Sequence, residues 1–328
     1  MQFSKALLSK GAALGLLLCL AHGVSAEEGG SGDYAPGTYA SLLNITPNVP
    51  GLAVGSSFIF YSGSFSGGKT LPFGGLLAAN IKGNVYLTDI SLAYTFCPTI
   101  LGAHYTCSIA IPYVWADAEA TVSLNPRLLP TLIGTPTKTV RDGTNGLADI
   151  FIIPAALNWT FGDFQINPQF FMVAPTGQYQ KGTLANNGKN HWMFDPVFGL
   201  SYFSHKTATE FTVIGGFAIS TQDPATHYRN GDVCHVEATL QQYSPLGKQT
   251  LLGVGANAFY FQQVTGDSGS GAVIGPNEGT DIGVGPVATL IHKAAKYNFS
   301  AQAKWLPELY TSHRLSGNWV WVTVGVQF

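Results

Sequence analysis

The sequence predicts an all-β fold: a transmembrane, antiparallel, up-and-down β-barrel of about 12 strands with a short N-terminal plug-like segment. Three observations lead to this prediction. Apolar and polar residues alternate in run after run, as they do in strands. Only 10% of the residues are charged, whereas water-soluble domains typically have about 25%. No stretch after the N-terminus approaches the roughly 18 consecutive apolar residues of a membrane helix, so strands must supply the apolar surface.

Residues 1–26 have the form of a secretory signal peptide. Two lysines precede an apolar run at 11–20, and small residues at 24–26 form a cleavage site. Cys19 raises lipid attachment as an alternative, which Leu18 disfavours because a lipid-attachment motif has a small residue there. We therefore expect export, and we exclude these residues from the fold.

The mature chain is expected to have two parts. Residues 27–50 are rich in Gly and Pro around Tyr34–Leu43 and are a candidate plug that folds into the lumen with one short helix. Residues 51–328 are expected to form the barrel. A barrel near 12 strands is intermediate between small barrels filled by side chains and wide porins, so a narrow or partly plugged lumen is expected.

The expected strands follow one another as hairpins bounded by turn residues. In the first half, a Gly/Ser-rich loop to Gly75 follows the first strand, Pro98–Gly102 turns the next pair, and 124–146 is a long loop. Gly162-Asp163 is a hairpin dipeptide. The strands expected in this half cover residues 54–62, 78–96, 105–118, 149–161, 164–179 and 191–205.

The second half continues the pattern of short turns and longer loops. Short turns are expected at Lys206, at Pro245–Lys248 and at His292–Lys296, and longer loops at 182–189, 222–231, 266–278 and 311–317. The strands expected here cover residues 208–221, 233–243, 250–262, 280–291, 297–309 and 318–328. Five short turns thus alternate with six longer loops, and both ends lie on one side. Bacterial outer-membrane barrels share these features, which predicts that location and outer-membrane lipid as a partner.

Period-two alternation separates a lipid face from a lumen face. In 210–220, Phe211 and Phe217 share one side while Glu210 and Thr212 share the other. A soluble β-sandwich also alternates, but its outward face is charged. The polar candidates for lining the lumen are His235, Glu237, Gln241, Lys304, Gln302, Glu210 and Asp195. Trp319, Trp321, Phe259 and Phe261 are expected to point inward as aromatic surfaces for a flat solute.

The last strand, GNWVWVTVGVQF, ends in a bare aromatic residue. Val324, Val326 and Phe328 share its apolar face. Barrel assembly machinery recognises such C-terminal strands, so we expect it as a partner.

Two cysteines flank the turn FCPTILGAHYTC. Because exported proteins meet an oxidising compartment, we expect a disulfide between Cys97 and Cys107.

Three other motifs do not complete an active site or a ligand site. Gly266-Asp-Ser-Gly269 resembles a serine-protease signature but has no accompanying triad in sequence. His227, Cys234 and His235 do not complete a zinc site, and the glycines from Gly253 precede no helix. We expect no cofactor, no metal, no catalytic residue and, because no basic patch is present, no nucleic-acid partner.

Three stretches resemble the bacterial outer-membrane family described as "protein involved in meta-pathway of phenol degradation". They are EEGGSGDYAPGTYA, the segment from GLADIFIIPAALNWTF to FDPVFGLSY, and STQDPATHYRNGDVCHVEATLQQY with the later FYFQQVTGDSGSGAVIG. The resemblance implies an outer-membrane barrel that takes up hydrophobic aromatic compounds, and it establishes no site residue.

We therefore expect passive, selective passage of hydrophobic or aromatic small molecules and no enzyme activity. Two alternatives remain open. An outer-membrane lipid hydrolase or acyltransferase would depend on Ser268, His235 or Glu237, and a structural or adhesive barrel would show no conductance.

Overall fold

The computed structural model describes residues 34–39, 41–73, 75–124, 134–276 and 278–328. The expected signal peptide at 1–26 and the start of the expected plug at 27–33 lie outside the described residues.

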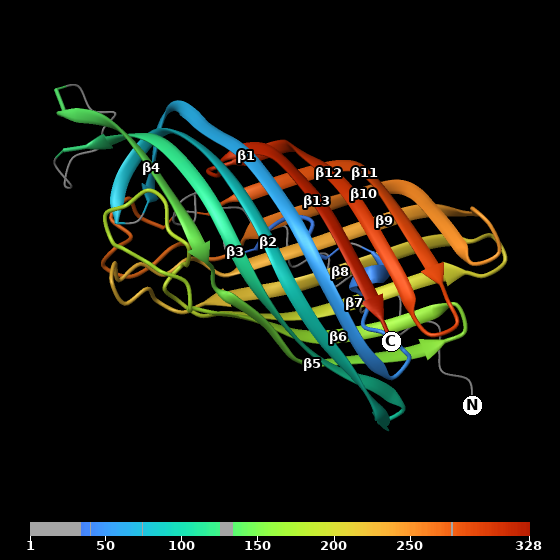
Figure 1. Ribbon diagram of the computed structural model, residues 1–328. Helices are drawn as coiled ribbons and strands as arrows, with labels where there is room; N and C mark the ends of the chain where they lie inside the picture. The colour runs from blue at the N-terminus through green and yellow to red at the C-terminus, as the bar shows by residue number, and fades with distance from the viewer. Residues whose placement is uncertain (1–33, 40, 74, 125–133, 277) are drawn as a thin grey trace, which may run out of the picture.

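The chain forms a closed antiparallel barrel (Figure 1). One sheet holds 13 strands. β4 pairs only with β3, so the other 12 strands form the ring, as predicted. The ring closes where β1 pairs with β13, from Ala53 opposite Gln327 to Ser64 opposite Ser316. The strands are β1 (Gly51–Phe73), β2 (Leu76–Ile100), β3 (Ala103–Ser123), β4 (Thr137–Leu147), β5 (Ile150–Phe161), β6 (Phe164–Ala174), β7 (Met193–Ser204), β8 (Thr209–Ser220), β9 (Val233–Pro245), β10 (Thr250–Gln263), β11 (Thr280–Lys293), β12 (Asn298–Ser312) and β13 (Ser316–Gln327).

The alternation of faces follows the predicted period of two. On β8, Glu210 and Thr212 are fully buried inside the ring while Phe211 is 48% exposed. The outer wall exposes many large apolar side chains, among them Ile90, Ile111, Phe198, Leu240, Val254 and Val322. A closed barrel satisfies its backbone hydrogen bonds internally, so it can present such a wall to lipid. The chain therefore forms a membrane-spanning barrel of the kind found in bacterial outer membranes. Among the described residues, no helix has the length and apolar character needed to cross a membrane.

The first strands are longer than predicted, and they extend beyond the ring at the end opposite the C-terminus (Figure 1). The Gly/Ser-rich stretch to Gly75, expected as a loop, belongs mainly to β1 and pairs with β2 across a break between Phe65 and Thr70. The expected loop 124–146 contains most of β4. This strand pairs with the part of β3 that begins at Tyr113. Because β5 pairs with β3 only up to Ala110, β4 covers a strand edge that would otherwise be open.

The predicted disulfide between Cys97 and Cys107 is wrong, because both thiols are free. Cys107 faces Tyr94 across the β2–β3 ladder, and Cys97 lies within a break in register between Thr95 and Thr99. The two cysteines are therefore not opposite each other, although their spacing around the turn suggested it.

Closure of the ring can be tested with a cysteine pair. Ser57 and Thr323 face each other across β1 and β13, with their hydroxyl oxygens 3.4 Å apart. In a chain whose native cysteines are replaced by alanine, Ser57→Cys with Thr323→Cys should form a disulfide that changes gel mobility until it is reduced. Ser57→Cys with Val322→Cys is the control, since Val322 points outward; equal cross-linking of both pairs would contradict this register.

Candidate functional site

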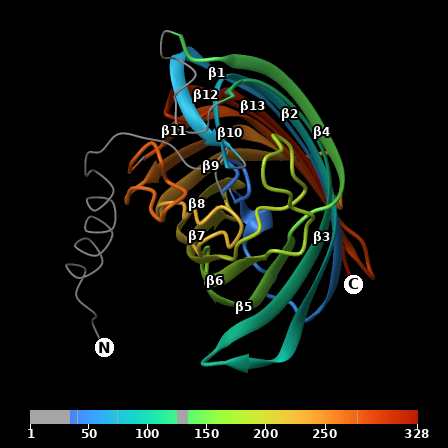
Figure 2. The same cartoon turned by 90° about the vertical axis from the view of Figure 1, so that its left-hand side faces the viewer.

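The N-terminal segment, residues 34–39 and 41–50, runs inside the ring of strands (Figure 2, dark blue). Its one regular element is the 3-10 helix η2 (Leu42–Asn44), which begins with a capping box. The Ser41 hydroxyl accepts from the Leu43 N–H, and the Asn44 side chain accepts from the Ser41 N–H. Because Tyr34, Tyr39 and Ile45 are buried against the lumen wall, the segment forms the centre of the barrel interior.

Glu237 on β9 is the main acceptor for this segment. Its fully buried carboxylate accepts hydrogen bonds from the Tyr34 hydroxyl, from the Gly37 N–H at 2.9 Å and from the Tyr39 N–H at 3.2 Å. The Lys304 ammonium donates to the Gly37 carbonyl and lies 5.3 Å from the centre of the Trp321 ring. Buried charges need such partners, so these two charges determine where the segment turns.

Gly37 is required at that turn. Its φ of +98° favours glycine, and a side chain there would collide with the Trp321 indole. The same indole donates to the carbonyl of Pro36 at 2.9 Å. The backbone at Gly37 thus lies closer to the Trp321 ring than a residue with a side chain would permit.

Asp195 and His235 form a second buried contact with the segment. The His235 Nε2 and the Asp195 carboxylate are 2.9 Å apart, and the Tyr39 hydroxyl donates to the same carboxylate at 3.4 Å. The Tyr34 ring stacks on the imidazole, with 3.9 Å between ring centres. The two tyrosines therefore cover the side chains that sequence analysis assigned to the lumen.

Polar side chains fix the rest of the segment along its length. The Leu42 N–H donates to Glu210 at 2.6 Å, and the Gln302 amide donates to the Ser41 hydroxyl at 2.8 Å. Gln241 supports Glu210 from the neighbouring strand at 3.0 Å. Further contacts bind Asn44 and Thr46 through the wall residues Asn158, Asn167 and Gln169.

The predicted lumen residues all lie inside the ring, but they do not line an open pore. The seven polar ones contact the segment or support a residue that does. Phe259 and Phe261 pack in two apolar clusters, and the Arg314 guanidinium lies 3.8 Å from the centre of the Phe261 ring. The period-two alternation placed these side chains inside the ring but does not encode what covers them.

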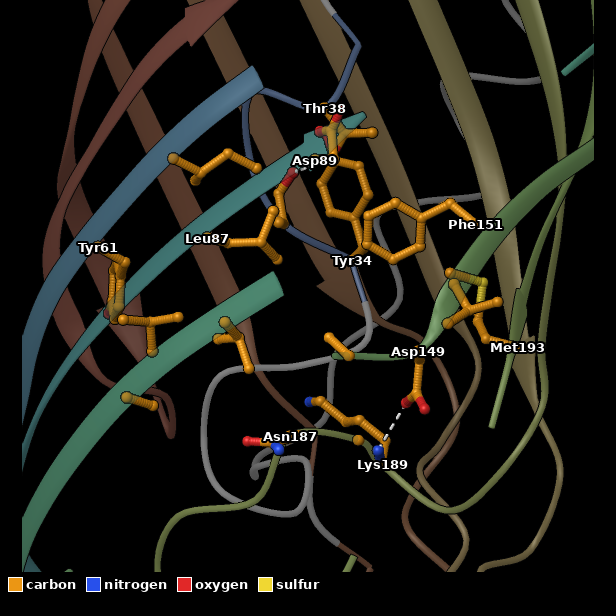
Figure 3. Close-up of a pocket in the computed structure, with 18 of the residues that line it drawn as sticks. Tyr34, Thr38, Tyr61, Leu87, Asp89, Asp149, Phe151, Asn187, Lys189 and Met193 are labelled. Atoms are coloured by element: carbon orange, nitrogen blue, oxygen red, sulfur yellow. Dashed lines mark hydrogen bonds between the residues drawn. The ribbon is translucent and has the colours of Figure 1, made fainter. Parts of the chain in front are cut away.

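A cavity of about 530 Å³ lies on the other side of the segment, against β1, β2, β3, β5 and β6. Tyr34 and Tyr39 form its inner side, and its wall is largely apolar (Figure 3). Trp319 and Trp321 are the two predicted aromatic residues that reach it. Apolar residues that sequence analysis did not select include Ile59, Ile81, Val85, Leu87, Phe151, Phe171, Val173 and Met193.

A signal for this cavity was present in β2. Ile81, Val85 and Leu87 occupy its inward positions, while Tyr86 and Ile90 on the opposite face are also apolar and exposed. A strand of a water-filled barrel alternates between polar and apolar faces. Two apolar faces in one strand therefore indicate that the lumen is apolar on this side.

A loop between β6 and β7 covers one end of the cavity. Asp149, just before β5, accepts from the Gly177 N–H at 2.9 Å and the Lys189 N–H at 2.7 Å. Burial raises the pKa of the Asp149 carboxyl group, and these two N–H groups oppose that shift. Figure 3 shows Asp149, Asn187 and Lys189 together at this end, away from Thr38 and Asp89.

The comparisons agree with this architecture. A family model described as "Putative MetA-pathway of phenol degradation" matches residues 62–324. The chain belongs to this family. No curated protein matches the chain.

Of three similar solved structures, the first has the same fold. The COG4313 outer membrane channel from Pseudomonas putida F1 has 13% identity and a TM-score of 0.56, covering 90% of this chain and 100% of that one. The beta domain of the Bordetella autotransporter BrkA has 11% identity and a TM-score of 0.46, covering 85% and 99%. A Pseudomonas aeruginosa FadL homologue has 7% identity and a TM-score of 0.42, covering 94% and 98%.

Removal of Glu237 should release the segment. In Glu237→Ala, three donors lose their acceptor, and the buried Lys304 ammonium loses the opposite charge that interacts with it. Such a loss typically costs about 3 kcal/mol. We expect much faster proteinase cleavage within 34–50 and a lower unfolding temperature in detergent.

Glu119→Ala is the matched control, since that glutamate pairs with Arg141 at the exposed surface. It changes the net charge equally and should leave cleavage unchanged. Equal cleavage of the two variants would show that Glu237 does not hold the segment.

Proposed function

We propose that this protein is an outer-membrane channel for the passive uptake of hydrophobic or aromatic small molecules, with residues 27–50 as its plug. One observation carries the proposal: the lumen contains an apolar cavity beside a segment that the opposite wall holds by hydrogen bonds. A volume near 530 Å³ falls in the range of small-molecule sites. Aromatic residues on both sides suit a flat solute.

The two halves of the lumen support a division of roles. Buried polar residues on β8, β9 and β12 hold the segment, and the cavity follows the apolar wall from β1 to β6. Of the wall residues that hydrogen-bond to the segment, few line the cavity, Trp321 being one. A solute in the cavity therefore leaves most of those hydrogen bonds undisturbed. Passage then requires movement of the segment rather than rupture of the barrel.

The orientation follows from the connections between strands. Outer-membrane barrels have short periplasmic turns and longer external loops. Because loop residues 184–189 and His191 line the cavity, its covered end faces the outside and receives the solute first. Barrel assembly machinery is the proposed partner at the other end, where it would recognise Val324, Val326 and Phe328. The family description, with its phenol degradation pathway, favours aromatic solutes.

A lipid hydrolase is less well supported by the arrangement of its candidate residues. Ser268 is exposed in the loop between β10 and β11, whereas His235 and Glu237 are fully buried beneath Tyr34. A nucleophile must lie within hydrogen-bond reach of its base.

Deletion of residues 27–50 tests the plug and the channel together. The deletion removes the segment that occupies the lumen, so we expect larger single-channel conductance in lipid bilayers and faster entry of aromatic solutes than of polar solutes of equal size. A well-folded barrel that neither conducts nor admits solute, with or without the segment, would overturn the proposal in favour of a structural barrel or an enzyme.

Filling the cavity tests its role in uptake. Ala110 on β3 lines the cavity, so Ala110→Trp should reduce uptake of aromatic solutes, on the order of tenfold if the site is filled, since each 1.4 kcal/mol changes an equilibrium tenfold. Ala155→Trp on β5 is the control, because Ala155 is exposed on the outer wall. The cavity would be irrelevant to transport if the two variants took up solute equally well.

A further inference from the structure

Asp89 is a carboxylate beside the apolar residues that line the cavity. It lies on β2 two positions after Leu87 and therefore on the same inward face. Its side chain is buried, with the residue 7% exposed, yet it lines the cavity. In Figure 3 it lies at the end of the cavity away from Asp149, near Leu87, Thr38 and Tyr34.

One oxygen of this carboxylate has no hydrogen-bond partner. Ser57 on β1 interacts with the carboxyl group, and the Ser56 hydroxyl donates to the backbone carbonyl of Asp89 at 2.7 Å. The Oδ1 atom of Asp89 receives no hydrogen bond. Among the described residues, no Lys, Arg or His forms an ion pair with Asp89.

The other carboxylates at the cavity are already satisfied. Asp149 accepts two backbone N–H groups. Asp117 is exposed and accepts from the Asn84 amide at 3.0 Å. Buried polar groups normally have partners, and an unsatisfied one at a functional cavity needs an explanation. Asp89 therefore differs from them: it lines the cavity, and its buried Oδ1 atom has no hydrogen-bond partner.

We propose that Asp89 is a specificity residue that binds a hydrogen-bond donor on the solute. This inference rests on the proposed function and refines its substrate class: an apolar, ring-sized solute with one hydroxyl or amino group. The O–H or N–H donates to the Asp89 carboxylate, whose reorientation toward the cavity gives its unpartnered oxygen a donor, while the ring lies between Leu87 and the aromatic residues Tyr34 and Phe151. Solutes with a carboxylate are disfavoured, because two acceptors of like charge would meet in an apolar site.

The test is equilibrium dialysis of the purified full-length protein in detergent against p-xylene, p-cresol, p-toluidine and p-toluate, with protein-free micelles as a blank. The first three differ in one methyl, hydroxyl or amino group of similar size. Affinities relative to p-xylene, compared between variants, remove each solute's own hydrophobicity from the result.

In Asp89→Leu, the relative affinity for p-cresol and p-toluidine should fall on the order of tenfold, and that for p-toluate should rise. Binding of p-xylene should persist, which shows that the cavity is intact. Asp89→Asn keeps an acceptor oxygen, so p-cresol should lose less affinity while p-toluate gains. Asp117→Leu is the matched control and should leave every ratio unchanged.

Unchanged ratios in both Asp89 variants, or an equal change in Asp117→Leu, would overturn the inference. Uptake into proteoliposomes separates this result from the channel proposal. If the binding ratios depend on Asp89 but no uptake occurs, the specificity site is supported and the channel proposal is overturned. If uptake occurs but the ratios do not depend on Asp89, the channel proposal is supported and the specificity site is overturned.

Discussion

The interior of this barrel depends on the buried carboxylate of Glu237. A 12-stranded ring encloses more space than its inward side chains fill, and buried charges within it need partners. Tyr34, Gly37 and Tyr39 provide three hydrogen bonds to that carboxylate, and Lys304 binds the carbonyl of Gly37. The N-terminal segment is thus placed by the same groups that would be unstable in an empty lumen.

The hydrogen bonds to the segment divide the lumen into two unlike halves. On β7, β8, β9 and β12 many of the inward residues are polar and buried under the segment, as Asp195, Glu210 and Gln302 show. On β1, β2 and β3 they are largely apolar and face the cavity. A uniformly polar lumen would favour water and ions, whereas this asymmetry leaves one largely apolar side beside the N-terminal segment.

The residue pattern along the chain predicted correctly those features that depend on a single strand or turn. The alternation in 210–220 correctly separated Phe211 from Glu210, and Gly162-Asp163 marked a real hairpin between β5 and β6. The pattern gave wrong predictions where the structure depends on which strands pair and in which register. β4 is a strand because β3 continues past β5, and Cys97 and Cys107 are apart because the β2–β3 register breaks beside them.

The amino-acid sequence by itself determined the strand number, the two faces of most strands and the membrane setting, because these follow from a period of two and from composition. Only the tertiary structure decided what the inward residues contact. His235 and Glu237 are covered by tyrosines some 200 positions earlier in the chain, and Asp89 shares a cavity with Phe151 and Trp319. Such neighbours arise from closing the ring around a separate segment, and neither spacing nor periodicity along one strand encodes that step.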